Sequence, residues 1–147
     1  MSYCLARLIL NKKIIIRITL WWGIIADIIE AIRMALPQIF ISTTGINATI
    51  NISFRYALLY GVPVMLGWSI LLFWTDRKPI ERRGIFICLI PVIIGYIIIE
   101  IIGIKIGLLN IQNTITTFIL QTIFLILTII SFIKAVRITQ RSSFNSY

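Results

Sequence analysis

Four long apolar stretches constrain this 147-residue chain more than any other feature. They cover residues 20–41, 54–75, 85–102 and 114–133. About 20 apolar residues in a helix cross the ~30 Å hydrocarbon core of a bilayer, and a helix satisfies all of its backbone polar groups there. Hydrophobic residues make up 59% of the sequence, against about 45–50% in an average soluble domain. The sequence therefore predicts an all-α, polytopic membrane protein, with four transmembrane helices in a single domain over residues 1–147.

Basic residues gather at one end of each predicted span. They precede the first span, fill the loop between the second and third, and follow the fourth: Arg7, Lys12, Lys13, Arg17, Arg77, Lys78, Arg82, Arg83, Lys134, Arg137 and Arg141. The opposite side has Arg55 and Lys105. Because short loops rich in Lys and Arg stay in the cytoplasm, this pattern predicts that both termini are cytoplasmic. The bases of the inner loop are expected to meet anionic lipid headgroups.

The first span allows a second interpretation because it contains Asp27, Glu30 and Arg33. Each charge adds about 2.5–3.5 kcal/mol to the free energy of insertion at the centre of a spanning helix. The segment could instead lie on the membrane surface as an amphipathic helix. That alternative leaves three spans and moves the N-terminal bases outside, against the charge rule. Four spans are therefore favoured, with the first shielded by its neighbours or by another subunit.

Asp27, Glu30 and Arg33 recur every three residues, so they form a slanting ladder on one helix face. One interpretation is an ion pair between Glu30 and Arg33 that locks helix packing. The other is a site for a proton, a cation or a small ligand, since ionisable groups at membrane depth are often functional. One base cannot neutralise two acids, so the acid without a counter-charge is the candidate carrier. Glu30 is expected to matter more than Asp27 because it lies deeper, and Pro37 is expected to kink the helix.

The fourth span has a polar stripe whose spacing of three, four and seven residues matches one helix face. Its members are Thr114, Thr117, Gln121 and Thr128, with Ser131 close by. Such a stripe faces other helices more often than lipid. Gln121 could hydrogen-bond Glu30 across the bundle, or it could serve only helix packing. Glu100, near the outer end of the third span, is expected to form an interfacial ion pair with Lys105 or Arg55.

The composition argues against several classes of site. The chain has no histidine, which removes His-ligated metals and every Ser-His or Cys-His nucleophile pair. Cys4 and Cys88 are far apart in sequence and form no CxxC motif. The net charge of +9 flanks apolar segments and does not line a polar face, so a nucleic-acid partner is not expected. We expect no cofactor, no metal and no catalytic residues.

Two segments resemble small, uncharacterised bacterial four-helix membrane proteins. They are the inner loop WTDRKPIERRG at 74–84 and the phrase WG…AD…EA…RMAL within 22–36. The resemblance implies a multi-pass protein of the bacterial cell membrane and implies no activity. Small multidrug resistance transporters are similar in having four short helices and a glutamate in the first, placed like Glu30. Residues 85–102 lack that family's Trp-x-Gly pattern and the charge bias here is stronger, so this likeness concerns architecture alone.

Three functions remain open from the sequence. The favoured one is a non-enzymatic membrane protein that binds or moves a cation, proton or small ligand through Asp27, Glu30, Arg33 and Gln121, as a homo-oligomer or with a partner subunit. The second is a structural or accessory subunit, whose charges pair with a partner's helix. The third is a lipid-acting membrane enzyme with Asp27 and Glu30 as acid and base, for which no nucleophile–base pair gives support.

Overall fold

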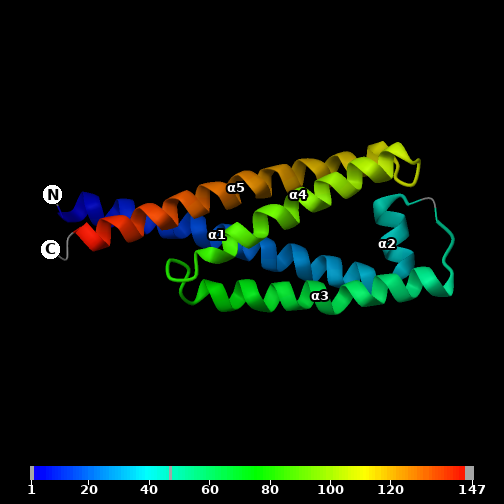
Figure 1. Ribbon diagram of the computed structural model, residues 1–147, viewed down its shortest axis with the longest axis horizontal. Helices are drawn as coiled ribbons and strands as arrows, with labels where there is room; N and C mark the ends of the chain where they lie inside the picture. The colour runs from blue at the N-terminus through cyan, green and yellow to red at the C-terminus, as the bar shows by residue number, and fades with distance from the viewer. Residues whose placement is uncertain (1, 47, 145–147) are drawn as a thin grey trace.

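The computed structural model describes residues 2–46 and 48–144, with side chains described for residues 14–46 and 48–140. The architecture is all-α, as predicted. The helices are α1 (Ser2–Ala35), α2 (Pro37–Thr44), α3 (Ile52–Asp76), α4 (Gly84–Lys105) and α5 (Ile111–Phe144). Four long helices form an elongated bundle, and the short α2 crosses one end of it (Figure 1).

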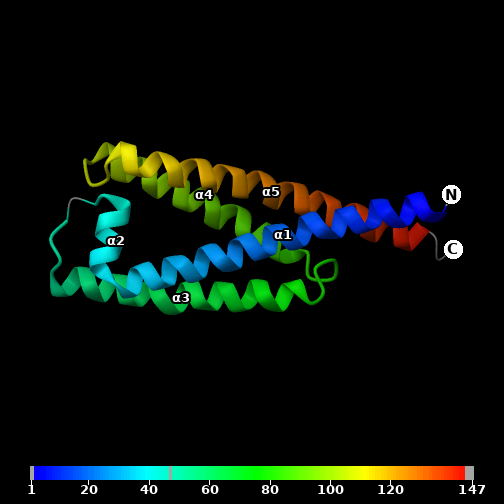
Figure 2. The ribbon, with the colours of Figure 1, turned by 180° about the vertical axis from the view of Figure 1, so that it is seen from behind.

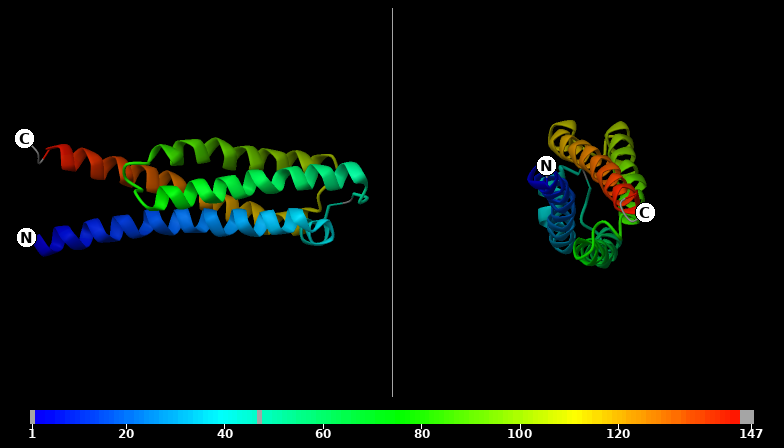
Figure 3. Two further views of the ribbon diagram at one scale, coloured as in Figure 1. Left: turned by 90° about the horizontal axis from the view of Figure 1, so that it is seen from below. Right: turned by 90° about the vertical axis from the view of Figure 1, so that its left-hand side faces the viewer.

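The long helices are not all equally close to one another. Helix α1 lies against α3 and α5, and α4 lies against α5. The view down the bundle shows this order, with α1 and α4 on opposite sides of it (Figure 3). Both termini lie at the end where the loop 77–83 joins α3 to α4 (Figure 2). We call this the loop end, and we call the opposite end, which α2 crosses, the α2 end.

Three contacts fix how α1 sits against α3. The guanidinium of Arg17 lies 3.2 Å from the carboxylate of Asp76, the last residue of α3. Farther along, Gly23 lies against Leu72, and Gly61 lies against Met34. The two helices are therefore antiparallel, and the part of α1 from Arg17 to Met34 lies beside the apolar length of α3.

The expected single helix over residues 20–41 is wrong, because the chain turns at Leu36. Helix α1 ends at Ala35, and Leu36 has non-helical dihedrals of φ −117° and ψ 83°. Pro37 then occupies the first position of α2. A proline disfavours helical dihedrals in the preceding residue but is well suited to a helix start. Gly45, at φ 66°, ends α2 in the left-handed conformation that glycine adopts most easily. Pro37 thus separates two helices where a kink was expected.

The other three predicted spans each correspond to one helix. Helices α3, α4 and the Ile111–Gln140 part of α5 are long and apolar enough to cross a membrane. Pro63 and Pro91 lie inside α3 and α4, which continue past them. The structure thus provides three candidate spans by length and composition, with α1 alongside them.

A compact apolar core lies toward the loop end of the bundle. It consists of Ile16, Leu20, Ile24, Leu72, Phe86, Leu89, Ile93 and Ala135. Helix α1 supplies three of these side chains, so it is an integral part of the bundle. Four segments distant in sequence meet here, because the loop end brings the second half of α3 and the first half of α4 together with α1 and α5 (Figure 1).

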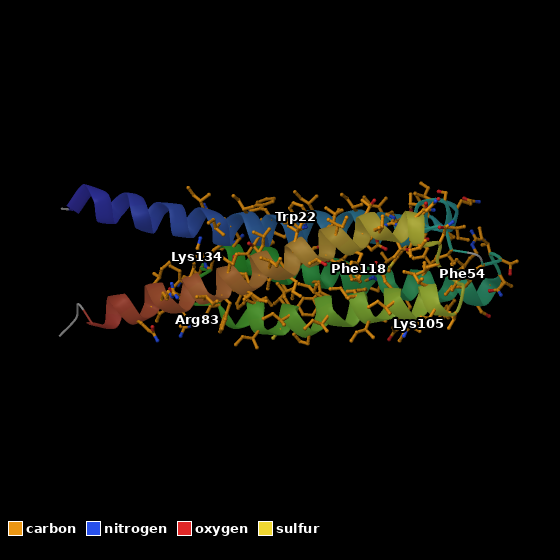
Figure 4. All side chains as sticks on the ribbon, turned by 90° about the horizontal axis from the view of Figure 1, so that it is seen from above. Trp22, Phe54, Arg83, Lys105, Phe118 and Lys134 are labelled. Carbon is orange, nitrogen blue, oxygen red and sulfur yellow. The ribbon has the colours of Figure 1, made fainter. Side chains whose placement is uncertain are left out.

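The outer surface of the bundle is apolar along its length. Large exposed hydrophobic side chains occur on all of the long helices, as the stick view shows (Figure 4). On α1 they include Ile18, Trp22, Ile25, Ile29 and Ile32. A monomeric soluble protein rarely exposes a contiguous apolar patch of more than a few hundred Å². This surface suits a lipid environment.

Candidate intramembrane polar site

Arg33 and Glu30 form the expected ion pair. The Arg33 Nη1 atom donates to Glu30 Oε2 at 2.6 Å, and only 22% and 28% of the two side-chain surfaces are exposed. Arg33 Nε also donates to Thr43 Oγ1 at 2.9 Å, and the guanidinium lies 5.6 Å from the ring centroid of Phe40. Both Thr43 and Phe40 belong to α2. Because the chain turns at Leu36, α2 packs against Arg33, the last of the three charged residues on α1. Arg33 therefore joins α1 to α2 as well as neutralising Glu30.

Asp27 is the acid left without a counter-charge. Its side chain is half-buried, and no described residue forms an ion pair or hydrogen bond with it. The nearest charge that acts on it is the like charge of Glu30, one helical turn away. The sequence predicted that one acid of the ladder lacks a partner. The structure identifies it as Asp27, whereas Glu30 had been expected to be the more important residue.

Tyr96 places the ladder at the middle of the bundle. Its hydroxyl lies 3.8 Å from the sulfur of Met65, which is close to the midpoint of α3. The charges of both Asp27 and Glu30 act on the same hydroxyl. Tyr96 is 38% exposed, and its hydroxyl contacts α3 through Met65. The acids of α1 thus lie about half-way between the two ends of α3.

Of the two alternatives for Gln121, the structure shows a bond that serves helix packing. Its Nε2 donates to Glu100 Oε1 of α4 at 2.9 Å, and not to Glu30. The expected ion pair of Glu100 with Lys105 or Arg55 is wrong, since Glu100 pairs with the amide of Gln121. Helices joined by a short connection are usually antiparallel neighbours. The connection between α4 and α5 spans only residues 106–110, and this was the sequence signal for the pair.

Two oxygen atoms of this pair are buried without a partner. Glu100 Oε2 and Gln121 Oε1 have no hydrogen-bond donor among the described residues and are shielded from solvent. Both atoms can only accept hydrogen bonds while the carboxylate is ionised. An unsatisfied buried acceptor costs about 1–3 kcal/mol. This pair is therefore the least satisfied polar contact in the described part of the bundle.

The polar stripe of α5 faces the interior, as predicted. Thr114, Thr128 and Ser131 are buried, and Thr117 and Gln121 are half-buried. Ser131 Oγ lies 2.8 Å from Thr19 Oγ1 of α1, a buried hydrogen bond that sequence reasoning did not find. Such a pair could not be found from spacing, because it depends on which helix lies against α5. The hydroxyls of Thr19 and Thr128 also donate to the carbonyls four residues back.

Several bases of the loop 77–83 contact their own chain. The guanidinium of Arg82 lies 3.4 Å from the ring centroid of Trp74 and also donates to the Trp74 carbonyl. Arg83 Nη1 donates to Thr139 Oγ1 of α5 at 2.8 Å. Arg77 and Lys78 are exposed, and Lys78 forms a solvent-exposed ion pair with a loop glutamate. The loop thus fixes α3 to α5 through two arginines and presents the two other bases outward.

The geometry restricts the chemistry of this interior. Among the described side chains, no group of three or more His, Cys, Asp or Glu could hold a metal ion. Apart from hydroxyls, the polar side chains described in this interior are two pairs, Glu30 with Arg33 and Glu100 with Gln121, together with the single carboxylate Asp27. Such an arrangement can bind and release one proton or one monovalent cation. Comparisons of the chain with protein-family models, with curated proteins and with solved structures gave no match.

Proposed function

We propose that this chain is an integral membrane protein of four spans, α1, α3, α4 and α5, in which Asp27 binds a proton or a small monovalent cation inside the bundle. The observation on which the proposal rests is the division of α1 into two faces. Its outward face from Ile18 to Ile32 is apolar, whereas Asp27, Glu30 and Arg33 are half-buried and turned toward the other helices.

This division supports a spanning helix over a surface helix. A helix that lies in the interface turns its charged face toward water and its apolar face toward lipid. In α1 the charged face is turned toward Tyr96 of α4 and toward the last turn of α2, where Arg33 donates to Thr43. Ionisable residues of spanning helices face the bundle interior in this way. The antiparallel contact with α3 also places α1 beside a helix that is itself a candidate span.

The distribution of bases supports cytoplasmic termini. Arg83 and Lys134 lie toward the loop end, and Lys105 lies toward the α2 end (Figure 4). Since both termini lie at the loop end, the bases in the first half of α1 and in the last part of α5 add to the same side. The exposed Arg77 and Lys78 then suit anionic headgroups, at about 1 kcal/mol for each base near the surface. A bacterial cell membrane fits this arrangement.

The ionic contacts support a binding role over an accessory role. An accessory subunit whose α1 charges pair with a partner's helix needs a free base or acid on its outer face. Arg33 is already bound to Glu30 and Thr43, and Asp27 faces inward. A single carboxylate with no base beside it is neutralised by one proton or one monovalent cation, which is the chemistry of a carrier or exchanger. A second copy of the chain could complete the pathway, since one such bundle encloses little space.

The orientation can be tested by cysteine labelling in intact cells. In a Cys88→Ala background, a maleimide that cannot cross the membrane should leave Cys4 unlabelled until the cells are lysed. A second chain with Thr49→Cys added provides the positive control, because Thr49 is exposed in the segment between α2 and α3 at the opposite end. Labelling of Cys4 in intact cells would contradict the four-span orientation.

The binding role can be tested in vesicles that contain the purified full chain and a trapped pH-reporting dye. An imposed gradient of pH, Na⁺ or K⁺ should drive a change in internal pH, and Asp27→Asn should abolish it because the amide cannot exchange a proton. Glu81→Gln is the matched control, since it removes one negative charge from an exposed loop position. Glu30→Gln should reduce the rate less than Asp27→Asn. If Asp27→Asn performs like the parent, or if the parent equals protein-free vesicles, the proposal is wrong.

A further inference from the structure

The contact between Glu100 and Gln121 contains two acceptor oxygens for which the described residues provide no hydrogen-bond donor. Gln121 Nε2 donates to Glu100 Oε1 at 2.9 Å, which leaves Glu100 Oε2 and Gln121 Oε1 buried and unpaired. A carboxylate has no donor, and the amide oxygen is itself an acceptor. Two acceptor oxygens therefore belong to the same pair of side chains, on facing helices, with no donor for either.

Rotation of the amide does not remove the difficulty. In a side-by-side contact with an ionised carboxylate, either orientation of the amide donates to one carboxylate oxygen and turns the amide oxygen toward the other. Both orientations therefore leave two acceptor oxygens without a donor. An acceptor oxygen that is buried without a donor destabilises the fold. The missing donor therefore has to come from a change in Glu100 itself or from a bound molecule.

The charged groups around Glu100 do not favour a carboxylate. Among the described residues, no base forms an ion pair with it. From α1, the charge that acts on it is that of Glu30, which is a like charge. Helix α5 offers the neutral Gln121, no ion pair reaches it from α3, and the next ionisable group on the inward face of α4 is Tyr96. An ionised carboxylate in the apolar interior of a membrane protein normally has a cationic partner.

We propose that Glu100 is a proton-binding site: Oε2 carries a proton and donates it to Gln121 Oε1, so that the carboxylic acid and the amide form two hydrogen bonds side by side. One proton, taken from water, then satisfies both unpaired oxygens and removes a charge from the membrane interior. The site rests on the proposed membrane placement of α4 and α5. It does not depend on binding at Asp27.

In the proposed pair, the strength of the contact between α4 and α5 depends on whether Glu100 is protonated. With the proton present, α4 and α5 are joined by two hydrogen bonds between these side chains. Loss of the proton breaks one bond and places two carboxylates, Glu100 and Glu30, in the same interior without a second base. Deprotonation should therefore loosen α4 from α5, whereas the neutral acid–amide pair holds them together.

Infrared spectroscopy of the full chain in lipid vesicles tests the proposal directly. Every chain compared carries Asp27→Asn, so that Asp27 adds no carboxyl band of its own. At neutral pH this parent should show the carbonyl stretch of a protonated carboxyl group, and adding Glu100→Gln should remove that band. Glu30→Gln should leave it in place. The Glu100→Gln chain should also keep the stability of the parent to heat, because two amides form the same pair of hydrogen bonds.

A second variant keeps the test decisive if Glu100→Gln does not fold. Gln121→Leu removes both hydrogen bonds but not the acid, so the carbonyl stretch should move to the higher frequency of an acid without a partner. The proposal is overturned if neither variant changes the protonated-carboxyl band of the parent at neutral pH, or if that band is absent. Failure of the Asp27 experiment in vesicles would leave these spectra unaffected, so the two proposals can fail separately.

Discussion

The two halves of the bundle differ in how their buried polar side chains are hydrogen-bonded. Toward the loop end, the buried polar side chains within the helices are mainly hydroxyls: Thr19, Ser69, Thr75, Thr128 and Ser131. Four of them donate to the carbonyl four residues back in their own helix. From Asp27 to the α2 end, the described interior polar groups include one such hydroxyl, Thr114. The others are carboxylates, a guanidinium and an amide, which no helix backbone can satisfy alone. They need partners from other elements.

This difference explains why the apolar core lies in the loop half. Hydroxyls satisfied by their own helix can be placed among Leu72, Phe86 and Ile93 without disturbing the packing. The charges of the other half have to be matched in position, and Asp27 and Glu100 have no base paired with them among the described residues. The loop half therefore provides rigid packing, and the α2 half provides the groups whose charge can change. The following changes test this division.

The largest effect is expected from Glu30→Leu. This change leaves the Arg33 guanidinium without its carboxylate in the α2 half, and breaking a buried ion pair costs about 3–5 kcal/mol. Unfolding of the purified protein by added denaturing detergent should show the loss. Glu30→Gln keeps an acceptor for Arg33 and should lose much less. The double variant Glu30→Leu with Arg33→Leu should recover most of the stability, and a double variant as unstable as the single one would count against a buried pair.

A smaller loss of stability is expected from alanine substitution at glycines of the α1–α3 contact. Gly23 lies in the loop half of this contact and Gly61 lies in the α2 half. A methyl group at Gly23 would lie 2.8 Å from Leu72 Cδ1 and 3.1 Å from Phe124 Cζ, in the packed loop half. At Gly61 it would meet the sulfur of Met34, at the end of a flexible side chain. Overpacking a core costs about 1–3 kcal/mol, whereas a methionine adapts its shape. Gly23→Ala should destabilise the protein and Gly61→Ala should not, as thermal unfolding in micelles would reveal; equal effects would remove the distinction.

The smallest effect concerns the hydrogen bond between Thr19 and Ser131 in the loop half. Because Thr19 also bonds to its own helix, the bond across the bundle should contribute about 0.6 kcal/mol, the average for such pairs in a membrane protein. A double-mutant cycle with Thr19→Val and Ser131→Ala measures this coupling energy. A coupling energy as large as that expected for Glu30 and Arg33 would mean that the loop half also depends on specific polar pairing.

Features set by spacing along one helix were predictable from the sequence. The apolar stretches 54–75, 85–102 and 114–133 correspond to α3, α4 and α5 because length and hydropathy need no tertiary information. The pair of Glu30 with Arg33 was predictable because residues three apart lie on the same face of a helix. The inward stripe of α5 follows from the same geometry. Pro37 was recognised as a point of disruption, but its local effect did not reveal that α2 would turn across the bundle.

Contacts between helices were decided by the tertiary structure alone. The sequence suggested Glu30 or simple helix packing for Gln121 and did not identify Glu100, since that contact depends on α5 lying beside α4 and on Arg33 already occupying Glu30. It likewise predicted an unpaired acid without identifying Asp27. The physical reason is that helix geometry fixes the neighbours of a residue within about one turn, whereas partners on other helices depend on which helices are adjacent and in what register.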